Sequence, residues 1–389
     1  MFRLITRNLS TLQIKNPRNP APSPNSNPID PSSFSFVSYL TASCGLSPEK
    51  ALAAAKKLTP KSNSIEAKRN PDAVLAFFAS HGFTKDQISK LIAASPCLLL
   101  CSPNGNLKPK MEFYLGAGFS SSDLAKLFGS DTQLLLSSLK TRIIPSFNFL
   151  RTILHSDKDI ITAVKYTPWL LHLDLQKNMV PNVDLLHSLG VPERRISGLA
   201  KFHADVLLRK TEKFRRMTER VIEMGFRPAH HSFTVALRCF SAVSAATWEA
   251  KMATFKSFGV PEDEILLAFK KQPLMMTVSE QKIKKSMALF VSKLNWKPEY
   301  VLANSLLLKF SLERRILPRI SCCDVLLSKG LMSDKAFNYQ VFWLSERRFF
   351  ETYVLRFQEE HPQVLEAYLS SMKQECKTRQ MLSSFVWWT

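Results

Sequence analysis

Apolar residues recur at helical spacing along most of the chain, in pairs of short segments that a glycine separates. The stretch between Pro109 and Pro145 shows the pattern. Its first segment ends at Gly118, which suits a left-handed helix cap, and Phe119 supplies the apolar contact that usually follows such a cap. Ser120, with an acid three residues later, suits the N-cap of a second helix. The apolar positions are Met111, Phe113, Tyr114 and Leu115 in the first segment, and Leu124, Leu127 and Phe128 in the second. The pattern predicts two helices joined by a tight turn.

Other segments begin and end in the same way. Thr84 and Gln87 form a predicted capping box. Pro192 with Glu193, and Pro261 with the acids after it, place proline and negative charge where a helix starts. Short apolar segments then lead to the next pair of helices: Leu98 and Leu99, Leu134 and Leu135, Leu170 and Leu171, Leu207 and Leu208.

The glycines repeat at a fixed step. Gly82, Gly118, Gly190, Gly225, Gly259 and Gly330 each follow an apolar segment and precede an apolar residue, at gaps of 36, 72, 35, 34 and 71 residues. The two doubled gaps predict repeats in which the glycine is replaced, at Leu154 and at Asn295. Two sets of prolines keep the same step: Pro96, Pro168 and Pro273 in the first set, and Pro109, Pro145 and Pro181 in the second. These markers predict repeats of about 35 residues.

One such repeat cannot bury its apolar face alone, so stacked neighbours must bury it. We therefore predict an all-α fold, a curved α-solenoid (superhelix) of about eight repeats over residues 70–332. Residues 34–60 are interpreted as an N-terminal helical cap. Residues 333–370, with a helix starting at Ser333, are interpreted as a C-terminal cap, and residues 371–389 as a tail.

The N-terminus has the composition of an organellar targeting peptide. The first 29 residues contain no Asp or Glu, and Arg3 and Arg7 accompany an apolar face of helical spacing. Residues 1–30 therefore predict a transit peptide running into a proline-rich linker, for a mitochondrion in preference to a chloroplast. The alternative is a tail without targeting function.

Charge narrows the choice of partner. The chain has 53 Lys and Arg against 32 Asp and Glu, a formal net charge of +21. Such an excess favours a polyanion, because neutralised phosphates release their counterions, although a merely basic organellar protein remains an alternative. Seven scattered cysteines, with no C-x-x-C pair, indicate a reduced interior. We expect no membrane span, cofactor, metal or catalytic residue, and a monomer.

The repeat resembles that of the mitochondrial transcription termination factor (mTERF) family, plant organellar type. The likeness rests on Gly82-Phe83 to Ile88, Gly118-Phe119 to Leu124, and Gly259-Val260 to Ile265, on the Pro96, Pro168 and Pro273 segments, and on Leu312–Arg319 with Leu326–Leu331. It covers nearly all of residues 36–370. The sequence departs from the family pattern at Leu154, Asn295 and Asp131.

The resemblance implies a curved helical solenoid that binds double-stranded DNA or RNA in organelles. Family roles include transcription termination or regulation, RNA processing and intron splicing. It therefore implies a regulator of organellar gene expression rather than an enzyme.

Basic residues cluster just before, or in the first turn of, the first helix of most repeats. Equivalent positions line up along one edge of a solenoid, where they would follow a phosphate backbone. The residues predicted to contact nucleic acid are Arg142, Lys177, Arg209, Lys210, Arg216, Lys282, Arg314 and Arg315. The wider cluster adds Lys108, Lys110, Lys213, Lys284, Lys285 and Arg319. The alternative is that these are solvated loop residues.

Two other classes of binding protein stay open. One is a helical scaffold for an acidic protein. The other is a pentatricopeptide-type RNA decoder, since Met224–Leu237 faintly resembles such a repeat.

Overall fold

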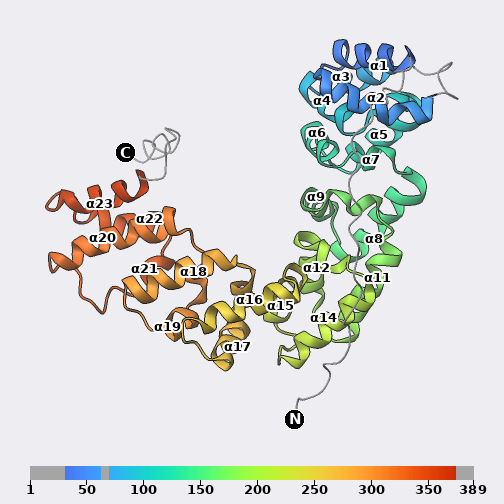
Figure 1. Ribbon diagram of the computed structural model, residues 1–389. Helices are drawn as coiled ribbons and strands as arrows, with labels where there is room; N and C mark the ends of the chain where they lie inside the picture. The colour runs from blue at the N-terminus through green and yellow to red at the C-terminus, as the bar shows by residue number, and fades with distance from the viewer. Residues whose placement is uncertain (1–30, 63–69, 374–389) are drawn as a thin grey trace, which may run out of the picture. The chain divides into compact units, whose positions relative to one another are not determined.

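The computed structural model describes residues 31–62 and 70–373, and within them the regular elements are helices, with no strand (Figure 1). The predicted transit peptide, residues 1–30, lies outside the described residues, as does most of the predicted tail. The chain folds as two compact parts, residues 1–106 and 107–389. In the described part of the chain, no helix is both long enough and apolar enough to cross a bilayer. The all-α prediction is confirmed.

The N-terminal part contains two helices followed by the first repeat. Its elements are α1 (Pro31–Ala42), α2 (Pro48–Ser62), α3 (Pro71–Ser80), α4 (Lys85–Ala94) and the 3₁₀ turn η2 (Pro96–Leu100). The expected cap over residues 34–60 is thus two helices, because Gly45 has a positive φ of 66° and reverses the chain. The Tyr39 hydroxyl donates to Asp72 at 2.7 Å and ties α1 to α3.

The C-terminal part continues the repeat and extends through helices after it. Its elements, in chain order, are α5 (Lys108–Gly116), α6 (Ser121–Ser130), α7 (Gln133–Leu136), η4 (Leu139–Ile143), α8 (Ile144–Leu154), α9 (Asp157–Tyr166), η5 (Pro168–His172), α10 (Leu175–Asn178), α11 (Val180–Ser188), α12 (Glu193–Phe202), α13 (Ala204–Leu207), α14 (Thr211–Glu223), α15 (His231–Ala242), α16 (Ala245–Lys256), α17 (Glu262–Lys271), η6 (Pro273–Thr277), α18 (Glu280–Ala288), η7 (Leu289–Lys293), α19 (Pro298–Ala303), η8 (Ser305–Lys309), η9 (Leu312–Ile316), α20 (Leu317–Ser328), α21 (Tyr339–Trp343), α22 (Glu346–Phe349), η10 (Phe350–Leu355) and α23 (Pro362–Lys373). η3 (Pro103–Leu107) precedes α5.

Each repeat has a first helix, a second helix and, in most repeats, a short third turn. The first helices are α3, α5, α8, α11, α14, α16, α18 and α20. The capping boxes predicted at Thr84 with Gln87 and at Ser120 with Asp123 are both present. The short apolar segments form the third turns, in which Leu98, Leu134, Leu170 and Leu207 are fully buried. The stacking of repeats therefore supplies the core, as the sequence pattern indicates.

The helix-ending glycines all have left-handed backbones, with φ from 69° at Gly330 to 99° at Gly118. Asn295 fills the same role at φ 55°, as predicted. The prediction for Leu154 is wrong by one residue, because α8 includes Leu154 and His155 takes the left-handed position at φ 57°. Leu154 is 4% exposed, so the core holds it in the helix and the next residue must make the turn.

Replacing His155 with glycine should therefore stabilise the protein. A left-handed backbone costs a residue with a Cβ about 1 kcal/mol, and glycine removes that cost. The His155–Glu193 contact that would be lost is long, at 3.8 Å, and solvent-exposed. We expect His155→Gly to raise the thermal unfolding midpoint, measured by circular dichroism, whereas Gly190→Ala should lower it. Equal or lower midpoints for His155→Gly would contradict this account.

The predicted helix start at Ser333 is also wrong. Residues 333–337 form only a turn, in which the Ala336 amide donates to the Ser333 carbonyl at 2.9 Å. The Asn338 side chain instead caps α21 by accepting from the Gln340 amide. An Asn with extended backbone is a strong helix start, so the helix cap lies five residues later than the serine suggested.

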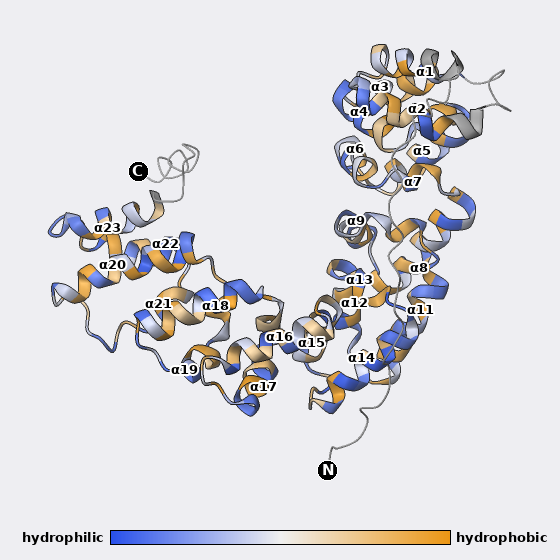
Figure 2. Ribbon diagram, in the orientation of Figure 1, coloured by the Kyte–Doolittle hydropathy of each residue, from blue (hydrophilic) through white to orange (hydrophobic). Residues whose placement is uncertain are grey.

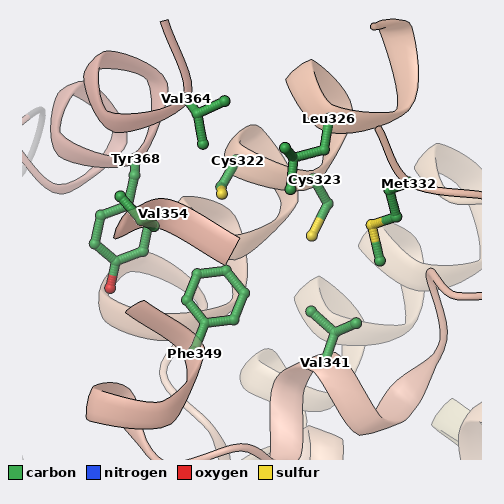
Figure 3. Packing of buried hydrophobic residues seen from close by; sticks show 9 residues of the cluster. All are labelled: Cys322, Cys323, Leu326, Met332, Val341, Phe349, Val354, Val364 and Tyr368. Atoms are coloured by element: carbon green, nitrogen blue, oxygen red, sulfur yellow. The ribbon is translucent and has the colours of Figure 1, made fainter. Parts of the chain in front are cut away.

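The last helices enclose an apolar cluster of their own (Figure 3). Its buried members are Cys322, Cys323, Leu326, Met332, Val341, Phe349, Val354, Val364 and Tyr368. α20 contributes the two cysteines, and α23 covers them with Val364 and Tyr368. In this arrangement α23 covers an apolar face of α20, and the interpretation of residues 333–370 as a cap remains a prediction.

Candidate nucleic-acid interface

All but one of the predicted nucleic-acid-binding residues lie where the first helix of a repeat starts, and Arg216 lies farther along such a helix. Arg142 is in η4 before α8, Lys177 is in α10 before α11, Arg209 and Lys210 precede α14, Arg216 is in α14, Lys282 is in the first turn of α18, and Arg314 and Arg315 are in η9 before α20. We call these eight residues the basic row. α14 is the most hydrophilic of these helices and appears mainly blue in Figure 2.

Contacts between neighbouring repeats place the first members of the row beside one another. Arg142 Nη1 lies 2.9 Å from Asp174 Oδ2. Asp174 is the N-cap of α10, which carries Lys177. Asn182 of α11 in turn donates to the Arg209 carbonyl at 2.7 Å. Arg142, Lys177 and Arg209 therefore follow one another along one edge of three successive repeats.

Members of the basic row are also adjacent farther along the chain, at Lys282 and Arg314. Lys282 Nζ donates to the carbonyl of Lys309 at 2.8 Å, a few residues before Arg314. Lys282 and Lys285 also line a cavity of about 260 Å³ together with Glu313 and neighbours of η9. The starts of α18 and η9 are thus adjacent, so Lys282 and Arg314 lie near each other.

Several members of the row are available to a ligand. Lys177, Lys210 and Arg314 are exposed and make no side-chain hydrogen bond or ion pair to any described residue. Arg142 and Arg216 form exposed ion pairs, the latter with Glu212 at 2.9 Å. Exposed pairs contribute only about 0–1 kcal/mol, so a phosphate can displace either carboxylate.

Arg142 holds the pKa of the Asp174 carboxyl below its usual range, chiefly through their hydrogen bond. The carboxylate therefore stays ionised at neutral pH and partly offsets the charge of Arg142. A nucleic-acid phosphate would compete with Asp174 for Arg142, and more weakly for Lys177, whose charge also acts on Asp174.

Other members of the row hold adjacent repeats together. Arg209 Nη2 donates to the Ser241 carbonyl at 2.6 Å. Arg315 Nη2 donates to the Leu344 carbonyl at 2.7 Å. A carbonyl leaves the guanidinium charge intact, so these side chains are fixed in place and remain cationic. Fixed cations bind an anion with less loss of side-chain entropy than free ones.

Two residues of the wider cluster are not on the surface. Lys110 is 4% exposed and Arg319 is 0% exposed. Lys110 Nζ donates to the Leu135 carbonyl in the third turn of its own repeat. The expectation that they belong to the basic stripe is therefore wrong, because both point into the protein, where the ends of short helical turns leave carbonyls that need donors.

Lys110 and Arg319 belong to a series that the sequence reading missed. One buried polar residue occupies the same place in successive first helices: Lys110, Ser146, Asn182, Thr218, Lys251, Ser286 and Arg319. Ser146 donates to the Leu173 carbonyl at 3.0 Å and Lys251 to the Met276 carbonyl at 2.6 Å, each reaching from its first helix to a segment 25–27 residues later. The sequence signal was the residue after Pro109, Pro145, Pro181 and Pro318, which is polar each time. We call this the buried polar position.

The buried cysteines are structural. Burial raises the pKa of the Cys239 and Cys322 thiols to about 12. A thiol that stays protonated at neutral pH is a poor nucleophile and a poor metal ligand. No group of three or more His, Cys, Asp or Glu among the described residues is placed to hold a metal ion.

Helical repeats with a cationic residue at successive helix starts define a class of protein that can follow a charged polymer along one edge. The family model described as mTERF matches residues 75–230 and 238–350, well over half of the chain. The chain belongs to the mTERF family. Proteins of this family are generally organellar, bind nucleic acid and are not enzymes. A search of curated proteins finds no match.

Proposed function

We propose that this protein regulates organellar gene expression by binding double-stranded DNA or RNA along the basic row, in transcription termination or regulation, or in RNA processing and splicing. The observation that carries the proposal is the contact chain from Arg142 to Arg209, which sets cations of successive repeats side by side. The mitochondrion is the proposed site of action, on the character of residues 1–30.

The direct test is the salt dependence of binding. The purified protein is titrated into fluorescent duplexes of DNA, RNA and DNA–RNA hybrid over a range of KCl concentrations. Each phosphate that the row neutralises lowers the logarithm of the binding constant by about 0.9 per logarithm of salt on B-form DNA. We expect a slope of roughly −4 to −8, and a clear preference for one type of duplex.

The central part of the row offers a variant test. Replacing Arg209, Lys210 and Arg216 of the row, together with their exposed neighbour Arg215, by Ala should weaken binding at least tenfold and leave the helical circular dichroism spectrum intact. Unchanged affinity with intact helicity would exclude the central row as the binding surface. Salt-insensitive or absent binding to all three duplexes would instead favour the scaffold for an acidic protein partner.

The site of action is tested separately. Crosslinking and immunoprecipitation from purified organelles, with bound DNA and RNA sequenced apart, should enrich a discrete locus. Enrichment of one polymer over the other would show which one the protein reads.

A further inference from the structure

A second concentration of positive charge lies in a surface cavity of about 530 Å³ between α12, α15 and the end of α17. Arg195 of α12, Arg238 of α15 and Lys271 of α17 line it, together with His230, His231 and Ser232 at the start of α15. None of its lining residues is Asp or Glu. The cavity is therefore cationic without an internal counter-charge, and none of its residues belongs to the basic row.

The guanidinium donors in this cavity are incompletely paired. Arg238 is partly buried and makes no hydrogen bond or ion pair with any described residue, although the charge of Asp205 acts on it from nearby. The Nε of Arg195 is buried and also without a partner, while its Nη1 donates to His231 Nδ1 at 3.0 Å. Buried donors are normally satisfied, and exceptions call for a missing partner. An anion in the cavity would supply one.

The start of α15 adds further donors. Its N-cap, His230, makes no side-chain hydrogen bond to the first turn, so no side chain caps the amides there. The free amides of a twelve-residue helix and its dipole both favour negative charge at this end. The cations and the helix start thus converge on the same cavity.

The charges of the two arginines also act on His231. Burial, and then the charges of Arg195 and Arg238, lower the pKa of His231 below its ordinary value. His231 Nδ1 accepts from Arg195, which requires the neutral ring at that nitrogen. A bound anion would offset the two arginine charges, so it should raise the pKa of His231.

We propose that this cavity binds the phosphate group of a nucleotide. Three cations and a helix start suit a phosphate, and Pro273 and Leu274 provide an apolar wall on the same cavity for the rest of the molecule. The volume exceeds what a phosphate alone needs. The phosphate belongs either to a free nucleotide or to a nucleic-acid backbone, and the proposal stands whether or not the basic row binds nucleic acid.

The first experiment uses inorganic phosphate and the full-length protein. Histidine ring signals are followed by NMR during titration with phosphate at constant ionic strength, with chloride as the comparison anion. We expect a saturable shift of the His231 signals and a rise of its pKa. No saturable shift beyond that caused by chloride would overturn the proposal.

Matched variants locate the binding. Arg238→Gln and Lys271→Gln should each weaken phosphate binding at least fivefold. Arg194→Gln is the control, because Arg194 is the exposed neighbour of Arg195 and does not line the cavity. Equal phosphate binding by all three variants would contradict the assignment. Because Lys271 is exposed, Lys271→Gln should fold, and it still tests the proposal if Arg238→Gln does not fold.

Competition then identifies the source of the phosphate. Displacement of phosphate by adenosine or uridine monophosphate supports a free nucleotide. Displacement by a duplex without terminal phosphates, and not by the mononucleotides, supports a backbone phosphate. If neither displaces inorganic phosphate, the nucleotide assignment is wrong. A finding that the basic row does not bind a duplex would not change the expected result of the phosphate titration. The two proposals are therefore tested independently.

Discussion

Replacing Arg319 with methionine should destabilise the C-terminal helices by about 2–4 kcal/mol, because it leaves buried carbonyl acceptors unpaired and breaks a half-buried ion pair. Arg319 is fully buried in α20 and donates to the carbonyls of Val341 at 2.8 Å and Leu344 at 2.9 Å. It also donates to Glu346 Oε2 at 2.7 Å. Methionine matches the stem but leaves all three acceptors without this donor.

The loss of stability in Arg319→Met should extend to the last helix, α23. Glu346 also accepts from the Tyr368 hydroxyl of α23, and the Arg319 guanidinium lies 4.5 Å from the centre of the Phe349 ring. Arg319 therefore links α20 through α22 to α23. Without it, Glu346 no longer connects α20 to Tyr368 of the apolar cluster in Figure 3.

Hydrogen exchange measured by mass spectrometry is the suitable readout, because repeat proteins do not unfold in one step. In Arg319→Met, amides of α20 and α23 should exchange orders of magnitude faster, whereas those of α5 to α9 should not change. Arg314→Met is the control, since Arg314 is exposed and lies in the preceding turn. Unchanged protection in α23 would show that apolar packing alone holds the cap.

Replacing Lys177, Lys210 and Arg314 together with Gln should lower nucleic-acid affinity about 10- to 100-fold at physiological salt. Each residue is exposed and makes no side-chain hydrogen bond or ion pair with a described residue, so its cationic group is open to a phosphate. Removing three phosphate contacts should reduce the slope of the salt dependence by about three. The loss should be similar for different sequences, because phosphate contacts carry little sequence information.

A charge-matched control distinguishes a local surface from net charge alone. Lys126 and Lys158 lie on second helices and Lys329 lies just after α20, all exposed. Changing these three to Gln removes the same charge away from the row and should cost less than threefold. Equal losses in the two triple variants would mean that the overall charge of +21, rather than the row, drives binding.

Most of the fold could be predicted because the information is local. Ser120 and Asp123 form their capping box within four residues, and glycine at a left-handed position follows from backbone sterics alone. The errors arose where burial of a side chain determines where a helix ends. His155 rather than Leu154 makes its turn because the core retains the leucine, and neighbours in space are not visible in a local pattern.

In the candidate site, too, positions along the chain could be predicted from the sequence, whereas burial and contacts in space could not. The position of Arg142 or Lys282 before or at a first helix could be predicted from spacing, but their partners could not. Lys110 and Arg314 look alike in sequence, yet one is buried against a carbonyl and the other is exposed. The cavity at Arg195 brings together residues from three elements that are far apart in the chain, so no local sequence pattern indicated it.

The buried polar position bears on how such an array can grow or shrink. Ser146, Asn182 and Lys251 each reach a carbonyl 25–27 residues later, at the end of their own repeat. A duplicated repeat would bring both donor and acceptor with it, and a deleted repeat would take both away. Serine, asparagine and lysine do the same task at this place, so a copied repeat could diverge there by point mutation. Duplication of any of these three repeats would thus leave no orphaned carbonyl at its buried polar position.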